Sequence, residues 1–135
     1  MLQRAQDGVY SQFEVQRGLP IQMLVKYFAK DGDNWRIKPE IKSMVSYRLY
    51  NLLDSFAALG TFDIVFCRNV LIYFDKATKE DIIRRIHALL PPDGYLVLGA
   101  AETVVGLDVP FTPAPNARGL YVKAAASSAP MRAAG

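Results

Sequence analysis

A continuous apolar stretch from Phe62 to Cys67, interrupted only by Asp63, is followed directly by the polar pair Arg68-Asn69. Such a run is typical of a strand that is buried on both faces in a parallel sheet. In open α/β sheets, ligands bind in the crevice beyond the carboxyl ends of the strands. The sequence therefore predicts a buried strand at 62–67 and puts Arg68 and Asn69 where a ligand would be contacted.

A helix and a second buried strand follow this junction. Asp75 or Thr78 is predicted to cap the helix, which Pro91-Pro92-Asp93-Gly94 ends. Residues 95–99 form the second strand, so the region is a β-α-β unit with a right-handed crossover. The apolar face of the helix consists of Ile82, Ile83, Ile86, Leu89 and Leu90.

The segments on either side of this unit are shorter. Residues 2–7 are predicted to be the last turns of a helix that Gly8 ends. Ile21, Leu24, Val25 and Phe28 recur at helical spacing and predict a second helix with one apolar face.

Two further antiparallel features are expected. The turn signal at 31–34, with alternating segments at 35–38 and 44–49, predicts a small β excursion. Phe111 and residues 120–122 flank a Pro-rich turn and predict a C-terminal hairpin, and residues 124–135 are expected to be a disordered tail.

Composition limits the class of protein. The 135 residues suffice for one modest domain, and the net charge of +3 comes from 16 basic and 13 acidic residues without a Lys/Arg run. This favours neither a nucleic acid nor a membrane as partner. The single cysteine, the short apolar runs and the polar N-terminus predict a cytoplasmic protein. The sequence contains no P-loop, no G-x-G-x-x-G and no zinc-type Cys/His cluster.

The candidate site residues each have two interpretations. Arg68 and Asn69 either end a strand at the surface, or Asn69 bonds an adenine or ribose edge while Arg68 bonds a carboxylate or holds a loop. Tyr73 lines a pocket or belongs to the core, and Glu102 is a wall of the site or the start of a loop.

Two reactive residue types are predicted to have ordinary roles. Cys67 is expected to be a buried thiol, because the chain offers no histidine beside it that would act as a base. His87 is expected to face solvent from the polar side of its helix.

Residues 62–74 read Phe-Asp-Ile-Val-Phe-Cys-Arg-Asn-Val-Leu-Ile-Tyr-Phe, which resembles the signature of the CheR-type chemotaxis receptor methyltransferases. Residues 51–53 (Asn-Leu-Leu), 90–96 (Leu-Pro-Pro-Asp-Gly-Tyr-Leu) and 98–103 (Leu-Gly-Ala-Ala-Glu-Thr) resemble three other stretches of that family. Together they cover most of residues 8–123 in the right order.

The resemblance implies an α/β fold: the later strands of a Rossmann-like methyltransferase sheet, a small antiparallel β-subdomain at about 35–49 and the C-terminal hairpin, in one domain of residues 1–123. It also implies transfer of a methyl group from S-adenosylmethionine to glutamate carboxylates on the cytoplasmic part of a chemoreceptor. In some members the β-subdomain docks a receptor tail peptide by adding to a sheet edge.

Site residues follow from the same resemblance. Asn51 and Leu52 would contact the adenine end of S-adenosylmethionine, Arg68 and Asn69 would lie along its adenosine and sulfonium region, and Tyr73 would border the transferring methyl group.

The chain departs from the family pattern in lacking the glycine-rich first strand-turn, the acidic residue that holds the ribose and the helical N-terminal domain. We therefore expect a portion of a catalytic domain that is inactive or binds cofactor weakly on its own. The strand at 62–67 would have one open edge, which predicts a homodimer or an exchange of elements across it.

The sequence also allows two other functions to be compared with this one. One is a non-catalytic interaction module that binds a receptor tail or a signalling partner through the β excursion. The other, a nucleic-acid amino-methyltransferase, is disfavoured because Asn69 is followed by Val70-Leu71-Ile72 where those enzymes have Pro-Pro and an aromatic residue.

Overall fold

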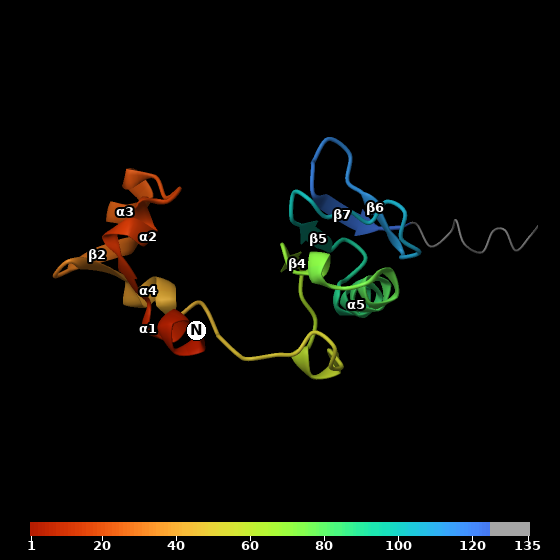
Figure 1. Cartoon of the computed structure of the whole chain (residues 1–135), viewed down its shortest axis with the longest axis horizontal. Coiled ribbons are helices and arrows are strands. Elements are labelled where there is room, and N and C mark those ends of the chain that lie inside the picture. The colour runs from red at the N-terminus through yellow and green to blue at the C-terminus, as the bar shows by residue number, and fades with distance from the viewer. Residues whose placement is uncertain (125–135) are drawn as a thin grey trace, which may run out of the picture. The chain divides into compact units, whose positions relative to one another are not determined.

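The computed structural model describes residues 1–124 of the chain. They fall into two compact units, Met1–Tyr50 and Asn51 onward, and each is described by itself (Figure 1). Apart from Ala124, the predicted tail lies outside the described residues.

The first unit contains short helices around a small sheet. Its elements are α1 (Leu2–Asp7), β1 (Val9–Ser11), α2 (Gln12–Gln16), α3 (Ile21–Tyr27), β2 (Phe28–Asp31), β3 (Asn34–Ile37) and α4 (Pro39–Lys42). As predicted, α1 ends at Gly8, which takes the left-handed conformation with φ 68° and donates its N–H to the carbonyl of Arg4. Ser11 and Glu14 form a capping box at the start of α2.

The sheet of this unit has the antiparallel order β1-β3-β2. The prediction of a strand at 44–49 is wrong, because residues 45–50 form no regular structure and the partners of β3 precede it. The predicted turn at 31–34 is present, but it joins β3 to β2, with Asp31 opposite Asn34. Pro39 then starts α4 at the position where a missing N–H costs nothing, so the chain leaves the sheet there.

The second unit contains the predicted β-α-β element. Its elements are the 3₁₀ turn η1 (Ala57–Leu59), β4 (Ile64–Cys67), the 3₁₀ turn η2 (Leu71–Tyr73), α5 (Lys76–Leu89), β5 (Tyr95–Leu98), β6 (Phe111–Pro113) and β7 (Leu120–Lys123). The sheet order is β4-β5-β7-β6, in which β4 and β5 are parallel and the C-terminal hairpin adds antiparallel strands. This confirms the α/β class with a partial, Rossmann-like sheet.

Helix α5 packs along one face of this sheet (Figure 1). Asp75 caps it by accepting the N–H of Thr78 at 2.9 Å, as predicted. Ile82 and Ile83 of the helix and Leu96 of β5 are fully buried, and each such side chain stabilises the fold by about 1.5–3 kcal/mol relative to exposure. The unit therefore has its own core.

Strand β4 was predicted to be buried on both faces, but only one of its faces is buried. Cys67 is buried and Val65 packs against the core, but Ile64 is 49% and Phe66 is 70% exposed. Burial on both faces needs a layer on each side of the strand, and in the second unit's described part the one α-helix covers a single side. Strand β4 also lies at the end of the sheet, so one edge of its ladder is open as expected.

Candidate functional site

The loops that follow β4 and β5 are joined by the carboxylate of Glu102. Its Oε1 accepts the N–H groups of Asn69 at 2.7 Å and Gly99 at 2.8 Å. Its Oε2 accepts those of Val70 at 3.1 Å and Leu71 at 2.8 Å. One buried side chain thus satisfies four backbone donors from two segments about thirty residues apart.

These bonds determine the charge state of Glu102. Burial alone would raise the pKa of the carboxyl group, but the N–H groups of Asn69, Gly99, Leu71 and Val70 favour the charged form and hold the pKa below its usual value. Glu102 is therefore ionised at neutral pH. Beside it lies a cavity of about 200 Å³, also lined by Ile72, Lys79 and Val105 among others.

The backbone at Asn69 is held in an uncommon conformation. Its φ is +59°, in the left-handed region that asparagine tolerates better than most residues. A Cβ added to Gly99 would stand 2.4 Å from Asn69 Oδ1 and 2.7 Å from Glu102 Oε1. Only glycine at 99 leaves room for the Asn69 amide and the carboxylate together.

Two of the predicted site residues, Arg68 and Asn69, directly follow β4, and a third, Tyr73, is the last residue of η2. Arg68 donates from Nε to the carbonyl of Leu98 at 3.3 Å, so it links the ends of β4 and β5. The side chains of Arg68, Asn69 and Tyr73 are exposed, and Tyr73, at 78%, is not the core residue of the alternative interpretation. The end of β4 thus exposes a basic and an amide side chain, and the 3₁₀ turn that follows exposes a phenolic one.

The other two predicted residues lie before β4. Asn51 is exposed, and its Oδ1 accepts the N–H of Leu53. Leu52 packs against the core, and its carbonyl accepts a hydrogen bond at 2.8 Å from Arg85 of α5. No hydrogen bond among the described residues joins Asn51 or Leu52 to Arg68, Asn69 or Tyr73.

Cys67 and His87 have no catalytic arrangement. Burial, followed by the negative charge of Glu102, raises the pKa of the Cys67 thiol to about 11, so it is the inert buried thiol that the sequence predicts. The prediction that His87 is a solvated surface residue is wrong, because it is half-buried and its ring packs edge to face with that of Phe111, with 5.2 Å between the ring centroids. Burial and the charge of Lys123 lower its pKa.

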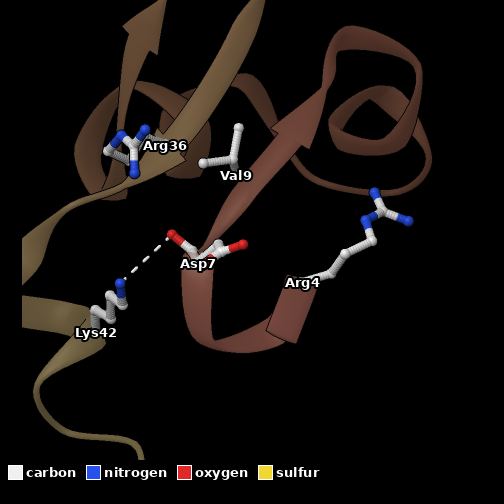
Figure 2. Close-up of a pocket in the computed structure, with 5 residues that line it drawn as sticks. All are labelled: Arg4, Asp7, Val9, Arg36 and Lys42. Atoms are coloured by element: carbon white, nitrogen blue, oxygen red, sulfur yellow. Dashed lines mark hydrogen bonds between the residues drawn. The ribbon is translucent and has the colours of Figure 1, made fainter. Parts of the chain in front are cut away.

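A second hollow, of about 460 Å³, lies in the first unit and is lined by Arg4, Asp7, Val9, Arg36 and Lys42 (Figure 2). Lys42 donates to the carbonyl of Asp7, and the side chain of Arg4 extends away from Lys42 and Arg36. Arg4 is paired with Glu14 and Arg36 with Asp31. The cations therefore do not converge on one point.

Among residues 1–124, no group of three or more His, Cys, Asp or Glu side chains could hold a metal ion. No helix in the same range is long and apolar enough to cross a membrane.

A β-α-β unit with exposed polar side chains at its strand ends is typical of cofactor-binding α/β domains. Comparison with known proteins identifies the family. The chain belongs to the CheR methyltransferases, because the family model described as "CheR methyltransferase, SAM binding domain" matches residues 1–119. The cofactor of this family is S-adenosylmethionine, so both the predicted family and the predicted cofactor are confirmed.

Curated relatives agree with this assignment. The chain is 52% identical over 108 residues to "Chemotaxis protein methyltransferase Cher2" of Pseudomonas putida and to "Chemotaxis protein methyltransferase 1" of Pseudomonas aeruginosa. Each match covers 79% of this chain and 39% of the relative. The "Chemotaxis protein methyltransferase" of Escherichia coli is 37% identical over 117 residues, which cover 83% of this chain and 41% of the relative. The chain thus spans about two fifths of the length of these relatives.

Glu102 is the residue whose role sequence reasoning missed. The sequence places Glu102 just after the second strand, but nothing in it indicates which backbone N–H groups the carboxylate would bond. The available signal was Gly99 three residues earlier, which marks a close approach of another group to the backbone.

Proposed function

We propose that this chain forms part of the catalytic domain of a cytoplasmic, S-adenosylmethionine-dependent methyltransferase that converts glutamate side chains of chemotaxis receptors to methyl esters. The observation that carries the proposal is the turn of residues 68–71 at the carboxyl end of β4, which Glu102 braces and which exposes Arg68 and Asn69. The membership of the chain in the CheR family, and the names of its relatives, support the choice of cofactor and of reaction.

The side chains at the strand end suit one wall of such a cofactor site. Within residues 1–124 the amide of Asn69 makes no hydrogen bond, so its donors and its acceptor are free for an adenosine edge. Arg68 uses its Nε on Leu98, which leaves its terminal nitrogens for a carboxylate. Asn51 and Leu52 are proposed for the adenine end, and Tyr73 for the border of the methyl group.

The proposed reaction needs little acid-base catalysis from Arg68, Asn69 and Tyr73. Bound S-adenosylmethionine would supply a methyl group attached to a positively charged sulfur. When the methyl group is transferred, the neutral thioether S-adenosylhomocysteine is the leaving group. A glutamate carboxylate is ionised at neutral pH and is already nucleophilic. The contribution of Arg68, Asn69 and Tyr73 is therefore to bind, to orient and to exclude water, and positioning of this kind supplies much of the rate.

Calorimetric titration of the chain with S-adenosylhomocysteine, the product form of the cofactor, tests the site. Asn69→Ala is expected to weaken binding about tenfold, the equivalent of one to two hydrogen bonds. Asn116→Ala is the matched control, because Asn116 has the same φ of +59° but lies in the β6–β7 turn. Equal affinity of the Asn69 variant and the unaltered chain would refute the assignment of Asn69.

We also propose that two copies of the chain associate through β4. The strand has an open ladder on one side, and its exposed face carries Ile64 and Phe66. Exposed apolar edges of this kind pair with other strands unless they are covered. A second copy offers the same edge, so antiparallel pairing of β4 with β4 would satisfy both ladders.

The interaction module remains a second candidate, and a specific observation favours it. Strand β2 lies at an edge of the three-stranded sheet, so its outer ladder could accept a receptor tail peptide as a further strand. Capture of tail peptides, with and without S-adenosylhomocysteine, separates the two functions. The N–H of Lys30 points away from β3, toward the open edge, because the hydrogen-bonded pairs of β2 and β3 are Tyr27–Lys38, Ala29–Arg36 and Asp31–Asn34. Binding that Lys30→Pro abolishes, and that the cofactor product does not change, would favour the module.

A further inference from the structure

The carboxylate of Glu102 satisfies four backbone N–H groups and also determines the conformation of the turn that follows β4. Three of its four donors are the successive N–H groups of Asn69, Val70 and Leu71, and all of them point at the one side chain. Consecutive amides converge on an anion in this way when the chain turns through a left-handed residue. That residue here is Asn69, with φ +59°.

A left-handed conformation costs free energy for any residue with a side chain, so it persists only where the surroundings hold it. The strong bonds between the charged Glu102 carboxylate and the amides on the C-terminal side of Asn69 provide this support. Without the negative charge, the attraction that holds the three N–H groups together would be weaker, and the Asn69 backbone would relax toward more common φ and ψ angles.

The same carboxylate determines where the side chain of Asn69 lies. Oε1 bonds both the Asn69 N–H and the Gly99 N–H, which draws the turn onto the end of β5. The Asn69 amide oxygen then occupies the space that a Cβ on Gly99 would fill, at 2.4 Å from it. The position of the proposed cofactor-contacting amide thus depends on two residues of the 99–102 loop.

We infer that Glu102 is a positioning residue for the cofactor site: it fixes the backbone turn that presents the Arg68 and Asn69 side chains, without contacting the cofactor. The inference rests on the proposed function, since it concerns the same site. Gly99 assists by leaving the space that the Asn69 amide needs.

The test compares Glu102→Gln with Glu80→Gln in the whole chain. Glu80 is a suitable control because its side chain is only 13% exposed and its Oε2 accepts the N–H of Asp108 at 2.7 Å, which ties down a different loop. Affinity for S-adenosylhomocysteine is measured by calorimetry and stability by thermal unfolding. The amide protons of residues 69–71 are observed by NMR without ligand.

Glu102→Gln is expected to weaken S-adenosylhomocysteine binding by about tenfold or more, because the turn that presents Asn69 is then held by weaker hydrogen bonds and adopts the binding conformation less often. The amide protons of Asn69 and Leu71 are expected to lose the downfield shift and the exchange protection that a carboxylate acceptor gives. Glu80→Gln is expected to lower the unfolding temperature while leaving affinity and those amide signals unchanged.

Equal affinity of Glu102→Gln and the unaltered chain would overturn the inference and leave the proposed function intact. If the unaltered chain itself fails to bind, the cofactor site proposed at the end of β4 is not formed by this chain alone, and the amide signals then decide whether Glu102 holds the turn. Should Glu102→Gln not fold, Gly99→Ala carries the test, because it keeps the charge of Glu102 but displaces both the Asn69 amide and the carboxylate that holds the turn. Unchanged affinity in that variant would equally overturn the inference.

Discussion

Glu102 links the stability of the second unit to acid pH. Because its folded-state pKa lies below the usual 4.5, its stabilising effect is complete above that pH. The effect is lost as the pH falls through the lower pKa of the folded protein, where the carboxyl group takes up a proton. The N–H groups that it accepts then face a neutral acid.

Urea unfolding of the unaltered chain and of Glu102→Gln at a series of pH values checks this dependence. Near neutral pH the variant is expected to be less stable by about 2 kcal/mol or more, from lost hydrogen bonds to a charged group. Below the usual carboxyl pKa the difference should shrink, since a protonated glutamate resembles glutamine. A difference that stays constant into strong acid would contradict the linkage.

Cys67 is predicted to be unreactive in the folded protein. Only the thiolate is nucleophilic, and burial beside a negative charge moves the pKa of this thiol to about 11. Alkylation with iodoacetamide near pH 8 should therefore be slow until urea unfolds the chain. Rapid labelling of the folded chain would refute the assignment.

The same shift predicts a loss of stability in alkali. Because the folded pKa of Cys67 is raised, its contribution is complete below the ordinary value of 9.0 and falls away between 9.0 and about 11, where the unfolded chain alone loses the proton. Cys67→Ala removes this component and should flatten the pH dependence over that range. Parallel stability curves for the two proteins would show that Cys67 does not contribute.

For Cys67 and Glu102, the sequence predicts the role of a residue only where that role depends on neighbours in the chain. The burial of Cys67 was predicted from the apolar run and is confirmed, because Cys67 lies on the face of β4 that packs against the core, unlike Phe66 of the same run. The role of Glu102 was not predictable, because its acceptor function depends on amides some thirty residues away that only the folded sheet brings near.

Helix α5 is the element on which the second unit depends. Ile83 has no exposed surface, and it belongs to the cluster that packs α5 against β4 and β5. Removing its side chain leaves a cavity, so Ile83→Ala is expected to destabilise the chain by about 2–5 kcal/mol and Ile83→Val by about 1 kcal/mol. Chemical denaturation measures both. Equal effects of the two variants would mean that the site collapses around the smaller residue.

Elements with strong local signals were predicted correctly, and those without were not. Helix α5 has a capping aspartate, a periodic apolar face and a Pro-Pro-Asp-Gly stop, all of which act within a few residues. The segment 44–49 has only an alternating pattern. Pairing in a sheet also needs a partner, and β3 takes its partners from β1 and β2, earlier in the chain.

The molecule as a whole consists of two units that each bury their own side chains but also expose large apolar ones. In the first unit, Ile21 and Val25 of α3 are 65% and 59% exposed, although their spacing predicted a buried face. In the second unit, the exposed apolar side chains are Ile64 and Phe66 of β4, which lies at the open edge of the sheet. The exposed strand combines apolar side chains with a row of unpaired backbone groups, which makes it the stronger site of association.

Association through β4 predicts a concentration-dependent dimer in sedimentation velocity experiments. Phe66→Lys should shift the chain toward the monomer, because a charge on an edge strand opposes pairing, while the 70% exposure of Phe66 keeps the cost to folding small. Phe13→Lys is the matched control: Phe13 is 69% exposed but lies on α2 of the first unit. A monomeric, well-folded unaltered chain, or equal effects of the two substitutions, would show that the β4 edge is not the interface.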